Sequence, residues 1–259
     1  MLAVYKRELL SYFRSPIGWL AIALYALLGG FVFSNSMSVS SAVNIGDELG
    51  FLRMVFMIVI PLITMRLFSE EKKNGTEVLL FTSSVPLFRI VLGKYLSALT
   101  LLLIMLSSTI LHVFIVLFMG GLVNASTIGS FIGFIFLGAV FIAIGVLASA
   151  ITENQIIAAA LSFIIILGTQ LLQAIASSAE GIVVSILNVA NLFRLSVETI
   201  NKVGENVAAG INWLDPYTRT DSYALGVFKL SPLLFCLSLV ILFLFLTYRI
   251  LEKRRWSQG

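Results

Sequence analysis

Few side chains in this sequence carry catalytic chemistry, and those that do stand apart from one another. The single histidine, His112, follows Ser108 by four residues in an apolar run, so one helical face could hold a Ser–His pair. A lone imidazole is too little for a zinc site, and the sequence has no HExxH motif and no Cys/His cluster. We therefore expect His112 to hydrogen-bond within a helix bundle, with an intramembrane hydrolase as an alternative.

Motifs for ATP hydrolysis and ion-driven transport are missing. Gly93-Lys94 is the only Gly-Lys pair, and Phe88 stands where the first glycine of a P-loop belongs. No Asp or Glu is expected inside the apolar runs described below, which removes the usual machinery of a proton- or sodium-driven transporter. The one cysteine, Cys236, excludes an intramolecular disulfide and is expected to be a small core or lipid-facing residue.

The composition indicates an integral membrane protein. Of the 259 residues, 59% are hydrophobic and 12% are charged, and the mean hydropathy is +1.04. Soluble domains are roughly 25% charged, and a chain this apolar cannot hide its surface from water. The sequence pI of about 9.3 is typical of lysine and arginine retained on the cytoplasmic side, so we expect no nucleic-acid partner.

Six apolar runs have the length of a membrane-spanning helix, which needs about 20 residues. They cover residues 17–35, 51–68, 90–119, 128–151, 156–175 and 232–251. The second run is unusual because Arg53 and Arg66 lie near its ends and Pro61 lies inside it. We expect both arginines to snorkel to opposite interfaces and Pro61 to kink the helix.

The distribution of basic residues predicts the orientation. Six spans place both termini on one side, and with the termini inside, 12 of the 17 Lys and Arg residues are cytoplasmic. The 13 acidic residues divide 6 inside and 7 outside, so the bias is specific to the basic residues. The sequence thus predicts a multi-pass plasma-membrane protein with both termini in the cytoplasm.

Two segments outside the spans are predicted to be helical. Residues 1–15 place an apolar face beside basic residues, which predicts an interfacial helix on the inner leaflet; that face comprises Leu2, Tyr5, Leu9 and Phe13. Residues 176–231 form a long extracellular loop, in which apolar residues at helical spacing predict an amphipathic helix on the outer surface, or alternatively a seventh span. Those residues are Ile186, Val189, Phe193, Val197 and Ile200.

The stretch at 69–86, SEEKKNGTEVLLFTSSVP, interrupts the apolar sequence between the second and third spans. The second helix is expected to continue through SEEKK until Asn74-Gly75 breaks it. A short element then exposes four apolar side chains, Val78, Leu79, Leu80 and Phe81. This element could be an amphipathic loop lying on the inner leaflet, or a docking element that fits a groove on a cytosolic partner.

Residues 60–99, from IPLITMRLFSEEKKNGT to IVLGKYLSAL, resemble the membrane subunits of ABC type-2 exporters. More narrowly, they resemble permeases associated with gliding motility and nitrous-oxide-reductase maturation. YKRELLSYFRSPIGWL near the N-terminus, LDPYTRTDSYALGV, and residues 237–256 at the C-terminus are also similar to the family. The chain departs from the pattern at Ser84, because the family usually has a proline directly after TS, whereas here Pro86 comes two residues later.

The resemblance implies one all-α permease domain over residues 1–259, with six spans, a cytosolic coupling helix at 69–86 and external helices in 176–231. Glu70, Glu71, Gly75 and Thr76 would shape the coupling element and contact the ATPase, and no residue of this chain would be catalytic.

The implied partners are two ATP-binding subunits that hold ATP and Mg²⁺, a second copy or a sister permease, membrane lipid, and an extracellular partner at 176–231. No cofactor is expected on this chain. The alternative from another class is a non-transporting membrane scaffold or assembly protein that uses the same loop as a contact.

Overall fold

The computed structural model describes residues 1–39, 45–78, 85–189 and 196–257. In these ranges the chain forms helices and no strand, as the composition predicts. The helices are α1 (Leu2–Arg14), α2 (Pro16–Val39), α3 (Ile45–Thr64), α4 (Ser69–Lys73), α6 (Leu87–Phe118), α7 (Ala125–Ile151), α8 (Gln155–Val189), α9 (Val197–Asn212), α10 (Pro216–Ala224) and α11 (Leu230–Ser257).

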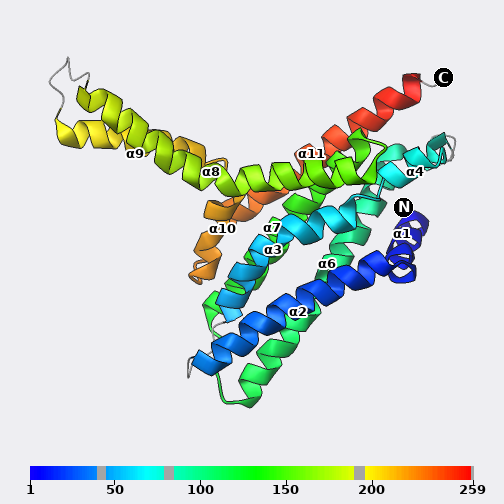
Figure 1. Ribbon diagram of the computed structural model, residues 1–259, viewed down its shortest axis with the longest axis horizontal. Coiled ribbons are helices and arrows are strands. Elements are labelled where there is room, and N and C mark those ends of the chain that lie inside the picture. The colour runs from blue at the N-terminus through cyan, green and yellow to red at the C-terminus, as the bar shows by residue number, and fades with distance from the viewer. Residues whose placement is uncertain (40–44, 79–84, 190–195, 258–259) are drawn as a thin grey trace.

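Six of the described helices are long and apolar enough to cross a membrane, which confirms the predicted number of spans. They are α2, α3 with α4, α6, α7, α8 and α11. Both chain termini and α4 lie at one end of the bundle, here called the terminal end, and α6 passes into α7 at the opposite or far end (Figure 1).

Helix α7 is the centre of the bundle. It packs against α3, α6, α8, α10 and α11. In an apolar 18-residue stretch of α7, 72% of the residues are buried, against 17% in such a stretch of α8. α7 is therefore a core helix, whereas α8 presents most of its apolar surface to the surroundings.

The second span differs from the prediction at both ends. It begins at Ile45, so Asp47 and Glu48 lie in its first turn, and the expectation that no acidic residue falls inside a span was wrong. Acidic side chains are favourable at a helix N-terminus, but their low hydropathy moved the predicted start to residue 51. The helix also stops at Thr64, and a turn at 65–68 separates it from α4, where a continuous helix was expected.

Arg53 packs inside the bundle, and its expected reach to a membrane interface stays a prediction. Its side chain is buried, and Nη1 lies 3.1 Å from Oδ1 of Asp221 on α10. The Tyr217 hydroxyl donates a 2.8 Å hydrogen bond to the Arg53 carbonyl. α10 therefore supplies an ion-pair partner for Arg53.

The segment after the fifth span forms a helical hairpin instead of the predicted helix. α8 continues to Val189, and α9 packs against it, so that the pair projects from the bundle (Figure 1). The predicted helix at 186–200 was wrong because its apolar spacing runs from the end of α8 to the start of α9. Phe193, a member of that predicted face, lies outside the described residues.

Helix α1 is a separate helix that ends before Ser15-Pro16, as expected. However, the face that packs against the bundle includes Glu8 and Tyr12, while Leu2 of the predicted apolar face is 67% exposed. The Tyr12 hydroxyl donates a 2.7 Å hydrogen bond to the Ile63 carbonyl of α3. α1 is thus joined to the end of the second span, and its predicted place on the inner leaflet stays a prediction.

Candidate functional site

The segment at 69–86, here called the arm, begins with α4 and turns sharply at Gly75. The Thr76 N–H donates to the Glu71 carbonyl at 2.9 Å, and the Gly75 N–H donates to the Lys72 carbonyl at 3.1 Å. Gly75 has φ +69°, which favours glycine. These two bonds form a Schellman motif and confirm the helix stop predicted at Asn74-Gly75.

Four charged side chains from three helices meet at the base of the arm, and we call Arg7, Glu8, Glu71 and Lys94 the charge cluster. Lys94 Nζ of α6 lies 3.0 Å from Oε1 of Glu8 and 2.9 Å from Oε2 of Glu71. Arg7 of α1 lies 2.7 Å from Oε1 of Glu8 and 2.6 Å from Oε1 of Glu71. Two carboxylates are therefore bridged by two cations.

Three members of the charge cluster, Glu8, Glu71 and Lys94, are shielded from water, whereas the Arg7 side chain is 56% exposed. The Lys94 side chain is 1% exposed, and its ammonium also donates to the Leu67 carbonyl. Burial alone would raise the pKa of the Glu8 carboxyl, but the Lys94 ammonium and the Arg7 guanidinium outweigh burial and lower this pKa below its usual range. Glu8 thus keeps its negative charge, and the cluster ties α1, α4 and α6 together.

Hydrogen bonds from α7 hold the other side of the arm's base. The Ser149 hydroxyl accepts from the Phe68 N–H at 2.9 Å and from the Ser69 N–H at 3.2 Å. The Lys72 ammonium donates to the Ala150 carbonyl. These bonds satisfy backbone groups in the break between α3 and α4. The break is therefore stabilised by specific hydrogen bonds.

The predicted docking residues fall into two groups. Glu71 is 16% exposed and belongs to the charge cluster, while Glu70 is half-buried and its carboxylate pairs with Arg66 at 2.8 Å. Thr76 is exposed beside Gly75, and Val78 is 53% exposed. Leu79, Leu80 and Phe81 lie outside the described residues. The acidic pair therefore supports the arm from inside, and the exposed surface of the arm runs from Lys73 to Thr76 and resumes at Val78 after the buried Glu77.

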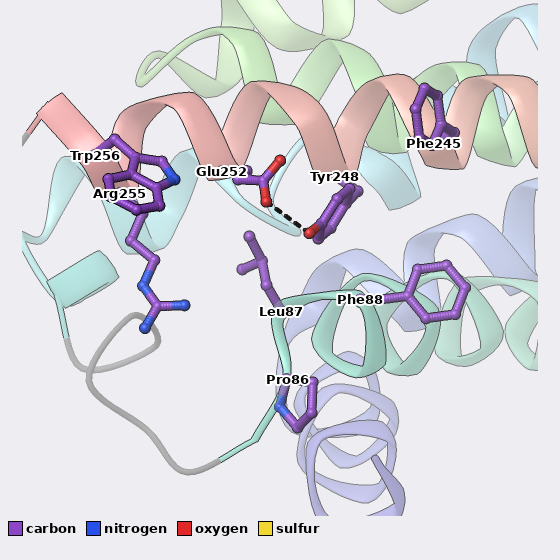
Figure 2. A pocket seen from close by; sticks show the side chains of 8 residues that line it. All are labelled: Pro86, Leu87, Phe88, Phe245, Tyr248, Glu252, Arg255 and Trp256. Carbon is purple, nitrogen blue, oxygen red and sulfur yellow. Dashed lines mark hydrogen bonds between the residues drawn. The ribbon is translucent and has the colours of Figure 1, made fainter.

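A groove of about 640 Å³ opens where the arm leads into α6 (Figure 2). The start of α6 contributes one wall and α11 the other. In Figure 2 the Tyr248 hydroxyl donates to Oε1 of Glu252, a bond of 2.8 Å. Phe88 and Tyr248 meet edge to face with ring centroids 6.5 Å apart. The groove places an aromatic and partly charged surface next to Pro86.

The alternative arrangement, a Ser–His pair of Ser108 and His112, does not form. The Ser108 hydroxyl donates to the Met105 carbonyl of its own helix at 2.9 Å. His112 instead places Nδ1 2.9 Å from Oε1 of Glu48 on α3, which agrees with the expected hydrogen bond inside the bundle. In the described part of the chain, no group of three or more His, Cys, Asp or Glu side chains could hold a metal ion.

Sequence reasoning missed Arg7, Glu8, Lys94 and Glu48. Lys94 gave one signal, because a lysine near the start of a long apolar segment needs an anion or a route to water. Glu8 interrupts an otherwise basic helix, and the two together could have suggested an ion pair. The signal for Glu48 was weaker, since its place inside the bundle depends on where α3 begins.

Comparison with known proteins identifies a family that covers nearly the whole chain. The family model described as "ABC-2 family transporter protein" matches residues 2–256. No curated protein matches the chain.

Proposed function

Because the chain belongs to the ABC-2 transporter family, we propose that it is the membrane-spanning subunit of an ATP-driven exporter. ABC-2 permeases typically lack an ATPase site of their own and work with an ATP-binding partner. The proposed complex has two permease chains, identical or sister, which form the translocation path, and two separate ATP-binding subunits. The narrower resemblance to the gliding-motility and nitrous-oxide-reductase-maturation permeases stays a prediction.

The main support for this proposal is the set of contacts that fixes the base of the arm to the bundle. Its base is fixed to α1, α6 and α7 by the charge cluster and by the bonds of Ser149 and Lys72. Its exposed part starts at Lys73 and includes Thr76 and Val78. A docked subunit that pushes on this exposed part would therefore move the base as one unit, together with the end of α3.

The proposed cycle uses this connection. ATP binding would draw the two ATP-binding subunits together and displace both arms, tilting α3 in each permease chain. Hydrolysis would release the subunits and reset the arms. The basic bias of the sequence supports an orientation in which the arm and both termini face the cytoplasm, where ATP is available.

Exposed apolar surface supports the second permease chain and the lipid contacts. α8 is the least buried of the described spans and carries exposed Ile156, Ile164 and Leu171. With the termini in the cytoplasm, the α8–α9 hairpin would lie on the extracellular side. We propose that it binds an extracellular partner.

Co-purification tests the proposed docking surface. The chain is co-expressed with a P-loop ATP-binding subunit from an adjacent reading frame and purified in detergent. We expect Val78→Asp to reduce the retained ATPase at least about tenfold, because an unpaired charge buried at an interface costs more than about 1.4 kcal/mol. The matched control is Val123→Asp at the far end, which should retain the wild-type amount. Glu71→Arg is avoided because it would break the charge cluster.

The outcomes separate the proposals. Loss of ATPase with Val78→Asp alone supports docking on the arm. Equal retention by both variants would place docking elsewhere on the chain. Failure of the wild-type chain to retain any ATPase would contradict the exporter and favour the membrane scaffold.

A further inference from the structure

Glu48 is a buried acid at the far end of the membrane-spanning bundle. It lies in the first turn of α3, and the residue is 2% exposed. A Cβ on Gly29 of α2 would come 3.1 Å from Oε1 of Glu48, so the glycine makes room for the carboxylate. Burying an ionised carboxylate in this position costs free energy unless the carboxylate is paired with a cation or protonated.

Only one oxygen of the Glu48 carboxylate is satisfied. Oε1 accepts from the Thr109 hydroxyl at 3.0 Å and lies 2.9 Å from Nδ1 of His112, both on α6. The Tyr25 hydroxyl of α2 lies 3.2 Å from Oγ1 of Thr109 and donates to it, since the Thr109 hydrogen is used on Glu48. Oε2 is buried and has no hydrogen-bond partner among the described residues.

The helices around Glu48 offer no other cation. α2 and α7 contain no Asp, Glu, Lys, Arg or His, and the only such residue of α8 is Glu180. On α6, Arg89 and Lys94 lie near the opposite end of the helix from His112.

On α3 itself the neighbouring charges are Asp47 and Arg53, and the Arg53 guanidinium is paired with Asp221. His112 is therefore the one described side chain placed to neutralise the carboxylate.

We propose that Glu48 and His112 together form a binding site for one proton inside the membrane-spanning bundle. The proton comes from the water at the far end and resides either on Oε2 of Glu48 or on Nε2 of His112. In both forms the pair is neutral overall, and loss of the proton leaves a buried negative charge. The buried Oε2 of Glu48, which has no hydrogen-bond partner among the described residues, is the atom that would carry the proton in the first form.

The site joins three helices, so proton binding favours one arrangement of them. Phe33 of α2 stacks on the His112 ring with centroids 4.3 Å apart and planes 6° apart. Separating α3 from α6 would let water reach Glu48 and release the proton. The protonated pair therefore holds α2, α3 and α6 together at the far end. This inference does not rest on the ATP-binding partner.

Since His112 is the only histidine, one isotope label reports the site. The full chain is labelled with ¹⁵N-histidine, purified through a histidine-free tag, and followed by NMR across a pH series. We expect the pH series of the two ring nitrogens to differ between the wild type and Glu48→Gln, because only the wild type has the carboxylate that shares the proton. The matched control is Glu180→Gln on the hairpin, which should titrate like the wild type.

Coincident curves for the wild type and Glu48→Gln would exclude Nε2 of His112 as the position of the proton, which leaves Oε2 of Glu48 to be tested. For that position, infrared spectroscopy of the wild type and His112→Gln follows the carbonyl band of protonated carboxyls, and it also serves if Glu48→Gln fails to fold. A band component that titrates at different pH in the two proteins supports the shared proton, and identical titrations contradict it. Neither measurement involves an ATPase. A result that contradicts the proton site would therefore not contradict the proposed exporter.

Discussion

Lys94→Met is expected to destabilise the folded protein by about 3 kcal/mol, because removing one partner of a buried ion pair leaves the other charge uncompensated. In the wild type the Lys94 ammonium contacts Glu8, Glu71 and the Leu67 carbonyl. Arg7 alone would then face both carboxylates, and its own side chain is 56% exposed. The base of the arm loses its tie to α6, so bound ATPase should fall as well.

Thermal and denaturant unfolding in detergent measure this loss. The matched control is Lys73→Met, which changes an exposed lysine of the same segment and should alter stability by no more than about 0.5 kcal/mol. An unfolding curve for Lys94→Met that overlays the wild-type curve would show that the charge cluster does not stabilise the terminal end.

Gly129→Ala should cost about 2 to 3 kcal/mol by overpacking the contact between α7 and α10. A Cβ on Gly129 would lie 2.0 Å from the Tyr223 carbonyl oxygen and 2.9 Å from the carbonyl carbon. These are backbone atoms of a buried residue, so no side chain can rotate away to relieve the clash. α10 must shift, and with it the Asp221 carboxylate that pairs with Arg53.

Gly210→Ala on α9 is the control with the opposite expected sign. A Cβ on Gly210 would meet nothing within 4 Å. Alanine is favoured over glycine in a helix by roughly 1 kcal/mol, so this variant should be slightly more stable than the wild type. Unfolding in detergent compares both variants. Equal stability of Gly129→Ala and the wild type would mean that α10 packs less closely than the structure shows.

The fold class and the number of spans could be predicted because each span needs its own run of apolar residues, whatever its neighbours are. Boundaries depend on more than hydropathy. Asp47 and Glu48 lowered the hydropathy of the first turn of α3, so the predicted span began later. The structure nevertheless buries Glu48 against α6. Likewise, apolar spacing across residues 186–200 suggested one helix, because this stretch of sequence contains no glycine or proline that would break it.

The arm shows the same division between local and tertiary information. The stop at Asn74-Gly75 is encoded locally, and the prediction was confirmed. The role of Glu71 was assigned from its place in a motif, whereas its contacts depend on Arg7 and Lys94, which are 64 and 23 positions away. Such pairings require the folded arrangement of α1, α4 and α6, which a single sequence does not specify.

Helix α3 runs from the proposed proton site to the arm. Its first turn carries Glu48 of the proposed proton site, and its last turn leads into the arm. In the proposed exporter, movement of the arm would tilt this helix and change the contact between Glu48 and His112. ATP-driven movement and proton binding would then be linked through one rigid element.

Site-specific cross-linking tests the central claim, that an ATP-binding subunit docks on the arm. In a Cys236→Ser background, which removes the only cysteine, Thr76→Cys carries a cross-linker on the exposed part of the arm, and Asn124→Cys carries it at the far end. The account predicts a cross-linked product with the ATPase from position 76 alone, with a yield that changes when ATP is added. Equal products from both positions, or none from position 76 in membranes where the ATPase is bound, would contradict it.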